Sequence, residues 1–307
     1  MSNQVVVSRG KLVAVADAIR TKKATTNALT LDDMAQAIES IEGGGGISFD
    51  DIASRALVGD VSVTVSNVQA YSFYGCTGIT SFSATNATTV GNYVCYSATG
   101  LTGALDFPNC ATIGQYAFYQ CTGITTLNAP NVTSLGQYAF SRCTDIATLS
   151  MPNLTSSPAG AFNGANTFRM ALKEIDLPKC TSIGASSMNY LDAIQRLVLP
   201  LVTSIGNSSF TNCSKLAFVD LPKCTSILNY GLRNNSNLAT LILRSETMCT
   251  LSNYALNSTA ISNGTGYVYV PRDLIPSYQV ATNWETIYAK NANVFRAIED
   301  YPEVVGG

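Results

Sequence analysis

The feature that most constrains this chain is a recurrence of about 22 residues, a period typical of stacked repeats. It runs from about residue 66 to residue 258, and its clearest mark is an aliphatic residue that is often followed by glycine. The mark residues are Val68, Val90, Ile113, Leu135, Ile183, Ile205, Ile227 and Leu251. Ser157 takes the place of the mark between Leu135 and Ile183, and the repeat after it is longer, with an insertion near residues 163–173. A unit this short cannot bury its own apolar face, so the copies are predicted to stack into a solenoid.

Each repeat contains the pattern L-x-x-L-x-L or a close variant, as in Ile146/Leu149/Met151. Its last apolar positions alternate with polar ones, which predicts a strand with one buried face. Proline cannot donate to a strand ladder, so the prolines that follow are predicted to end these strands. They are Pro130, Pro152, Pro178, Pro200 and Pro222. The next segment, such as PNVTSLG, predicts a second short strand, and a segment such as QYAFSRC predicts a compact turn or a single helical turn.

The two ends of the chain differ from the repeats. Residues 1–42 predict two short helices, which are too short to be stable alone and therefore need a packing partner. Their apolar stripes are Leu12, Val15 and Ile19 in the first helix and Met34, Ile38 and Ile41 in the second. Residues 43–47 predict a flexible glycine linker, residues 48–265 the solenoid, and residues 266–307 a mixed C-terminal cap.

Composition excludes several function classes. The chain has no histidine, so serine or cysteine hydrolysis lacks its usual base, and we predict no catalytic residues. A net charge of −2 without a basic run argues against nucleic-acid binding. The N-terminus has no apolar segment of a secretory signal, and no apolar run reaches the roughly 20 residues that span a bilayer. We therefore expect a protein made in a cytoplasm, without membrane insertion, cofactor or metal.

Eight of the nine cysteines fall into register with the repeats, with Cys95 at the position of the recurring phenylalanine. Four lie eight residues after a mark and three lie three residues before one, at positions where other repeats place small apolar residues. They are Cys76, Cys121, Cys143 and Cys213 in the first group and Cys110, Cys180 and Cys224 in the second. The count is odd, and the sequence has neither a C-x₂-C pair nor histidine to complete a zinc site. Reduced thiols packed as small apolar side chains are the favoured interpretation.

Two surfaces are candidate binding sites. Tyrosines stand three and six residues after successive marks, as the pairs Tyr71/Tyr74, Tyr93/Tyr96 and Tyr116/Tyr119. Such rings suit sugar stacking or protein contact, and the competing interpretation is that they only cover the turn layer. The second candidate is the outward strand face, where later repeats place charged and amide side chains, with a solvated sheet surface as the alternative. These side chains are Lys173, Glu174, Asp176, Gln195, Arg196 and Asp220.

The unit PNVTSLGQYAFSRCTDIATLSMP (130–152) resembles the BspA-like leucine-rich repeat of bacterial surface proteins and bacteriophage genomes. Its core is I-G-x-x-A-F-x-x-C-x-x-L-x-x-L, and Ser157, Met188 and Leu232 depart from that pattern. The resemblance implies a β-rich leucine-rich-repeat solenoid of the α/β class, with about nine repeats of roughly 22 residues.

Two terminal segments carry a further resemblance. Residues 16–41 look like a helical module at the start of phage virion proteins, and residues 269–291 are similar to the ending of phage-borne repeat proteins. The resemblance implies a non-enzymatic virion protein, a tail fibre, baseplate or head fibre component. Its N-terminal helices would bind other virion proteins and copies of itself, for example as a trimer, and its solenoid would bind a host-surface glycan or protein. The alternative is a bacterial surface adhesin or a secreted interaction protein.

Overall fold

The computed structural model describes residues 58–306. The two predicted N-terminal helices, the glycine linker and the first residues of the solenoid lie outside the described residues. The chain forms a parallel β-solenoid of about nine turns, which divides into two compact units between Ile146 and Ala147.

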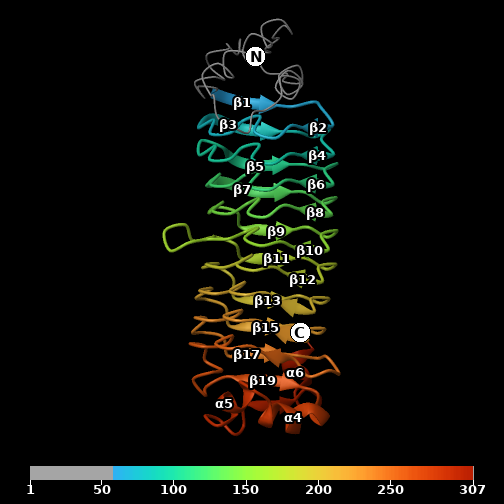
Figure 1. Cartoon of the computed structure of the whole chain (residues 1–307), viewed down its shortest axis with the longest axis vertical. Helices are drawn as coiled ribbons and strands as arrows, with labels where there is room; N and C mark the ends of the chain where they lie inside the picture. The colour runs from blue at the N-terminus through green and yellow to red at the C-terminus, as the bar shows by residue number, and fades with distance from the viewer. Residues whose placement is uncertain (1–57, 307) are drawn as a thin grey trace, which may run out of the picture. The chain divides into compact units, whose positions relative to one another are not determined.

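The first unit contains two parallel sheets, and each turn of the chain contributes one strand to each sheet (Figure 1). The longer strands pair in the order β1-β3-β5-β7 and the two-residue strands in the order β2-β4-β6-β8. The longer strands are β1 (Val58–Ser62), β3 (Gly78–Ser83), β5 (Thr102–Asp106) and β7 (Gly123–Asn128). The short strands are β2 (Asn67–Val68), β4 (Thr89–Val90), β6 (Thr112–Ile113) and β8 (Ser134–Leu135).

The second unit repeats this construction. Its longer strands form the pair β9-β11 and the series β13-β15-β17-β19-β20, and its short strands form β10-β12-β14-β16-β18. The longer strands are β9 (Thr148–Ser150), β11 (Glu174–Asp176), β13 (Arg196–Val198), β15 (Phe218–Asp220), β17 (Thr240–Ile242), β19 (Tyr267–Val270) and β20 (Phe295–Ala297). The short strands are β10 (Ser156–Ser157), β12 (Ser182–Ile183), β14 (Ser204–Ile205), β16 (Ser226–Ile227) and β18 (Thr250–Leu251).

The C-terminal cap begins with β19 and includes the helices that the structure describes. They are η1 (Arg272–Leu274), α4 (Ile275–Val280), α5 (Trp284–Tyr288), η2 (Ile298–Asp300) and α6 (Pro302–Val305). Trp284 is fully buried, and its indole N–H donates to the Cys249 carbonyl at 2.8 Å. The buried Tyr278 hydroxyl accepts from the Cys249 backbone N–H at 2.8 Å. The cap therefore covers the apolar end of the last repeat, as stacked repeats require.

The predicted register is confirmed. The mark residues pair with one another along the short strands, as in Val68↔Val90 and Ile205↔Ile227, and all of them are buried. Ser157 pairs with Ile183 in the same column, and its buried hydroxyl lies 2.7 Å from the Ser187 hydroxyl. Glycine follows the mark for a steric reason. A Cβ atom on Gly114 would lie only 2.5 Å from the Gly91 carbonyl carbon.

The alternative of a single helical turn after the short strand is wrong. In most repeats, the residues three and seven positions after the mark adopt left-handed backbone conformations, which closes a compact turn. Examples are Tyr93 and Ser97, both with φ 56°, and Tyr116 and Gln120, with φ 54° and 61°. No helix occurs between residues 58 and 271 of the described chain, so helices contribute only to the C-terminal cap.

Two expectations for the later strands need correction. Ile175, at the inward position that Leu149 holds in the preceding repeat, is only half-buried, because β11 ends one ladder and β13 begins another. Asp220, expected on the solvated face, is 4% exposed because Arg244 covers it, with N–O distances of 2.6 and 3.2 Å. The insertion lies where expected: Ala165 and Phe168 bridge across a tight turn that projects from the second unit (Figure 1).

Candidate functional site: a tyrosine ladder

The first unit carries a row of tyrosines on the turns that follow its short strands. Tyr71, Tyr93, Tyr116 and Tyr138, three residues after each mark, are left-handed, with φ between 54° and 63°. This conformation is uncommon for a bulky residue, and hydrogen bonds to the next repeat hold it. The backbone N–H of Tyr71 donates to the Asn92 carbonyl, and that of Tyr93 to the Gln115 carbonyl, each at 2.9 Å. The backbone therefore places the same ring at the same point of each turn.

The rings stack in two columns, which we call the tyrosine ladder. The first column joins Tyr71, Tyr93, Tyr116 and Tyr138 with centroid distances of 4.9, 5.0 and 4.9 Å and interplanar angles of 5° to 15°. The second joins Tyr74, Tyr96 and Tyr119 at 4.9 and 4.8 Å. These spacings match the roughly 4.8 Å between neighbouring strands, so the solenoid itself sets the ring spacing.

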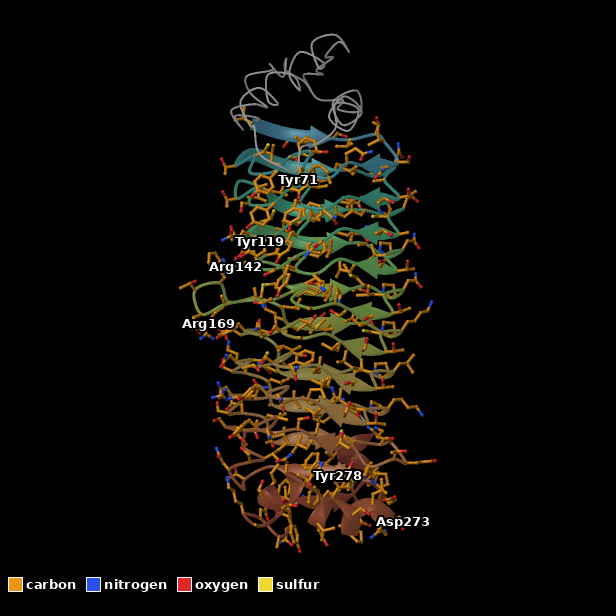
Figure 2. The ribbon with its side chains drawn as sticks, viewed as in Figure 1. Tyr71, Tyr119, Arg142, Arg169, Asp273 and Tyr278 are labelled. Atoms are coloured by element: carbon orange, nitrogen blue, oxygen red, sulfur yellow. The ribbon has the colours of Figure 1, made fainter. Side chains whose placement is uncertain are left out.

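The two columns lie against each other. Centroid distances between columns range from 5.5 to 6.4 Å, with the ring planes tilted by 42° to 68°. Where Ser141 replaces the next ring of the second column, Arg142 lies over the Tyr119 ring, with its guanidinium carbon 5.2 Å from the centroid. Figure 2 shows Tyr71, Tyr119 and Arg142 on one side of the first unit. The ladder is thus a continuous, corrugated aromatic strip.

Each ring in the ladder is partly exposed, from half-buried positions to 38% at Tyr71. The structure therefore brings the six predicted tyrosines together. Part of each ring covers the turn layer, and the rest is exposed to solvent. Within a column, each face of an interior ring is covered by the neighbouring ring. The interior rings of the ladder therefore expose only their edges and hydroxyl groups. Sugar stacking needs an open ring face. Of the two predicted binding modes, sugar stacking therefore fits this geometry less well than protein contact.

Sequence reasoning left two members out of the predicted site. Tyr138 shares the register of Tyr116 and could have been included on that ground. Arg142 lies seven residues after its mark, where other repeats have Ser97 or Gln120, so spacing alone did not single it out.

Ionisation of three central rings of the ladder is suppressed. Desolvation raises the pKa of Tyr93, and the neighbouring phenols of Tyr71 and Tyr74 raise it further. The pKa values of Tyr96 and Tyr116 are raised for the same two reasons, with desolvation again the larger. Packed phenols oppose one another's ionisation because each phenolate would face another. Tyr93, Tyr96 and Tyr116 therefore stay uncharged above the ordinary tyrosine pKa.

Alkaline titration should detect this effect. We expect the tyrosinate absorbance at 295 nm to rise at higher pH in the folded protein than in guanidinium chloride. Since the unfolded phenols ionise near pH 10.0, the contribution of Tyr93, Tyr96 and Tyr116 to stability is complete below that pH. It is lost as the pH rises through the higher folded values. Coincident folded and unfolded titration curves would contradict the packed arrangement.

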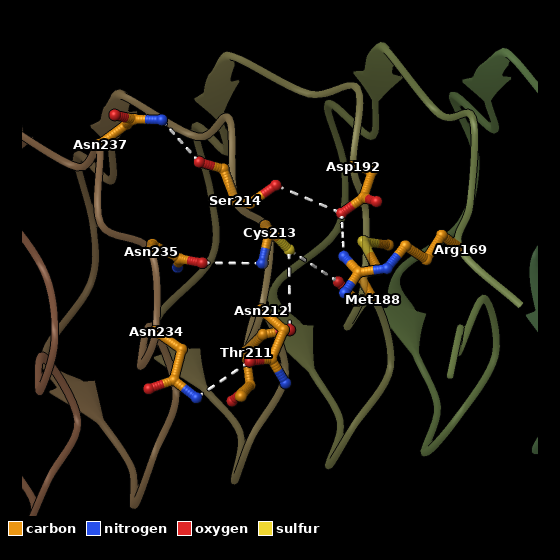
Figure 3. Close-up of polar contacts among 10 residues, drawn as sticks. All are labelled: Arg169, Met188, Asp192, Thr211, Asn212, Cys213, Ser214, Asn234, Asn235 and Asn237. Atoms are coloured by element: carbon orange, nitrogen blue, oxygen red, sulfur yellow. Dashed lines mark hydrogen bonds and ion pairs between the residues drawn. The ribbon is translucent and has the colours of Figure 1, made fainter. Parts of the chain in front are cut away.

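The corresponding turns of the second unit are mainly polar. Asn234 Nδ2 donates to Asn212 Oδ1 at 2.9 Å, and the buried Asn235 accepts from the Cys213 backbone N–H at 2.8 Å (Figure 3). Arg169, on the inserted turn, pairs with Asp192 at 2.6 Å. Tyr230 and Tyr254 form a single stacked pair at 5.6 Å. An extended aromatic strip is therefore a property of the first unit.

The second predicted surface, the outward strand face, has a depression of about 410 Å³ where β11 and β13 fail to pair. Its lining residues are Lys173, Glu174, Ile175, Ala193, Gln195, Arg196 and Val198. The Arg196 guanidinium lies 3.8 Å from the Phe218 ring centroid. The lining mixes both charge signs with apolar side chains, which does not indicate one ligand chemistry.

The profile of the BspA-type leucine-rich repeat region, a model of six repeat copies, matches residues 60–169 and 164–266. The chain belongs to the BspA-type leucine-rich repeat family. The match covers most of the described chain, including the whole tyrosine ladder. The chain has no significant match among curated proteins.

Several solved structures are similar to this chain at low identity. A leucine-rich cell surface protein of Faecalibacterium prausnitzii is 18% identical, with a TM-score of 0.49, over 67% of this chain and 64% of that protein. A T. pallidum leucine-rich repeat protein is 18% identical, with a TM-score of 0.34, over 64% and 77% of the two chains. The pneumococcal vaccine antigen PcpA is 11% identical, with a TM-score of 0.37, over 78% and 88%. At such identities and TM-scores the likeness identifies no ligand.

Two other kinds of site are absent from the described residues. Residues 58–306 contain no cluster of three or more cysteine, aspartate or glutamate side chains that could hold a metal ion. None of the helices in this range is long and apolar enough to cross a membrane.

Proposed function

We propose that this protein is a non-enzymatic adhesin-type interaction protein of the bacterial surface, and that the tyrosine ladder contacts its partner. The observation that carries the proposal is the continuous strip of seven tyrosine rings, held in place by the solenoid backbone and partly exposed along its length. Tyrosine is enriched at protein interfaces because it joins an apolar ring to a polar tip at low conformational cost. A rigid strip of such rings needs little ordering when a partner binds.

The proposal that the protein is not an enzyme rests on which reactive side chains the chain contains and where they lie. The chain lacks histidine, and all nine of its thiols are buried away from any substrate. A binding role also fits the BspA-type family, whose members are typically proteins of the bacterial cell surface.

Removing one central ring tests the proposed contact. We would measure retention of labelled protein on an array of immobilised glycans and extracellular-matrix proteins. Tyr96→Ala is the informative variant, because Tyr96 lies in the middle of the second column. We expect it to weaken binding at least about tenfold, as loss of a central aromatic contact does.

Tyr254→Ala is the matched control. Tyr254 is 56% exposed at the equivalent turn of the second unit, but it belongs to an isolated pair. Its removal should leave array binding unchanged. If Tyr96→Ala retains everything that the wild-type protein retains, the ladder is not the contact surface.

A virion protein is the second candidate, favoured by the phage-like resemblances of residues 16–41 and 269–291. In that setting Leu12, Val15, Ile19, Met34, Ile38 and Ile41 would attach the chain to other virion proteins and to copies of itself. A solenoid-specific antibody in electron microscopy would label phage particles under this hypothesis and the bacterial envelope under the adhesin hypothesis. In either setting the ladder remains the proposed contact.

A further inference from the structure

We propose that the tyrosine ladder binds uncharged, proline-rich segments of a partner protein in the polyproline II conformation. This inference rests on the proposed function, because it names the class of ligand for the same surface. Charge, hydrogen-bonding capacity and spacing each contribute to the assignment.

The first argument is charge. The turn segments that carry the three tyrosine pairs, residues 69–77, 91–99 and 114–122, contain no aspartate, glutamate, lysine or arginine. Arg142 is the first charged side chain of this layer, at the end of the second column. An anionic or cationic ligand would lose hydration against this strip without gaining an ionic partner. The strip is therefore complementary to an uncharged ligand.

The second argument is hydrogen bonding. Stacking covers both ring faces of Tyr93, Tyr96 and Tyr116, so their hydroxyls and ring edges are the available contacts. Phenols are protonated at neutral pH and able to donate, and the raised pKa values of Tyr93, Tyr96 and Tyr116 extend that state to higher pH. A polyproline II segment has no internal hydrogen bonds and presents its backbone carbonyls as acceptors, and proline brings no N–H that would need a partner. A row of phenol donors fits that acceptor-only backbone.

The third argument is spacing. A polyproline II helix has three residues per turn and a rise of about 3.1 Å per residue, so one face recurs about every 9.3 Å. Two steps of the ladder, with rings 4.9 and 4.8 Å apart in the second column, span nearly the same length. A β-strand presents one face about every 6.7 Å, which matches neither one step nor two. The ladder is thus in register with polyproline II and out of register with an extended strand.

The tilt between the columns gives the ligand a place to lie. The interplanar angles of 42° to 68° make the strip a corrugated surface, against which pyrrolidine rings can pack along tyrosine edges. Aromatic surfaces that recognise polyproline II segments exploit the low conformational entropy of the preformed ligand helix. Five to six residues, at about 3.1 Å each, would cover the ladder.

The test is titration of the full-length protein with a fluorescent decaproline peptide, with a glycine-serine decapeptide and cellohexaose as comparison ligands. We expect decaproline to bind and the other two ligands not to bind. Tyr96→Phe removes one hydroxyl and keeps the ring in the column, and it should weaken binding roughly threefold to tenfold. Tyr96→Ala should weaken it by at least tenfold, and Tyr254→Ala should leave it unchanged.

The possible outcomes separate this inference from the proposed function. Cellohexaose binding that depends on Tyr96, without decaproline binding, would overturn the polyproline inference and leave the ladder as a binding surface. Decaproline binding that Tyr96→Ala does not change would also overturn it, because the peptide would then bind elsewhere. If no ligand here and no array component above depends on Tyr96, both proposals fail. Far-ultraviolet circular dichroism of each variant shows that loss of binding is not loss of folding.

Discussion

In the folded protein, all nine cysteine thiols are expected to react with dithionitrobenzoate at least roughly a thousandfold more slowly than in the denatured protein. None of them is more than 4% exposed, so the reagent reaches them only after the chain opens. An unfolding free energy of about 5 kcal/mol, the lower end of the usual range, corresponds to a protection of more than a thousandfold. Nine thiols should be counted after denaturation without reductant.

Ionisation adds to this protection. Burial raises the pKa of Cys95 and Cys143 well above the ordinary value, and it raises that of Cys213 to about 12. Only the thiolate attacks the reagent, so these thiols stay unreactive even at mildly alkaline pH. Cys249 and Cys224 differ, because their sulfurs lie 4.0 Å apart. The hydrogen bond from Cys249 lowers the pKa of Cys224 and raises that of Cys249.

The sign of the resulting pH dependence follows from the raised values. Thiols of the unfolded chain ionise near pH 9.0, while the buried thiols with raised pKa values remain protonated. Their contribution to stability is complete below that pH and is lost as the pH rises further. Rapid labelling of a thiol at neutral pH, located by mass spectrometry, would contradict the burial of that column. A denatured count of seven would reveal a disulfide.

The periodic part of this fold could be predicted from the sequence because stacking gives each repeat position a fixed environment. Val68, Val90 and Ile113 recur at one position, and the ladder that pairs them keeps that position buried in each turn. The same logic placed Cys121 and Cys143 in the core, where burial rather than chemistry determines the residue type. The repeat register was therefore enough to predict most of the buried positions of the solenoid.

The turn conformation could not be predicted in this way. Tyrosine has no preference for the left-handed region, yet Tyr71, Tyr93 and Tyr116 adopt it because hydrogen bonds to the next repeat hold the backbone. Stacking between repeats overrides the local preference. The ring columns follow from the same backbone geometry, so the sequence indicated that these tyrosines recur but not that each covers its neighbour's face.

Features that depart from the repeat period also could not be predicted from the sequence. The inserted turn near residues 163–173 is followed by a break between β11 and β13, which leaves Ile175 half-buried. Asp220 is covered by Arg244, a contact between single side chains that no repeat position specifies. Contacts of this kind do not recur from repeat to repeat, so the repeat period does not predict them.

Replacing Leu149 by alanine is expected to lower the free energy of unfolding by about 2–5 kcal/mol, as truncation of a buried leucine does. Leu149 is the central residue of β9, is 1% exposed, and pairs with Ile175 of β11. Alanine would leave a cavity between rigidly stacked turns, which relax little because their backbones are hydrogen-bonded to one another. The measurement is urea denaturation followed by far-ultraviolet circular dichroism.

Thr148→Ala is the control, since the two residues are neighbours on one strand and face opposite ways. Thr148 is exposed, and its replacement should change the free energy of unfolding by no more than about 0.5 kcal/mol. Long repeat arrays can depart from two-state unfolding, so the transition midpoints of both variants are compared with the wild type under identical conditions. Equal shifts for the two variants would mean that the strand does not present Leu149 inward. The solenoid geometry that aligns the tyrosine rings depends on that inward column, so such a result would also remove the basis of the ladder.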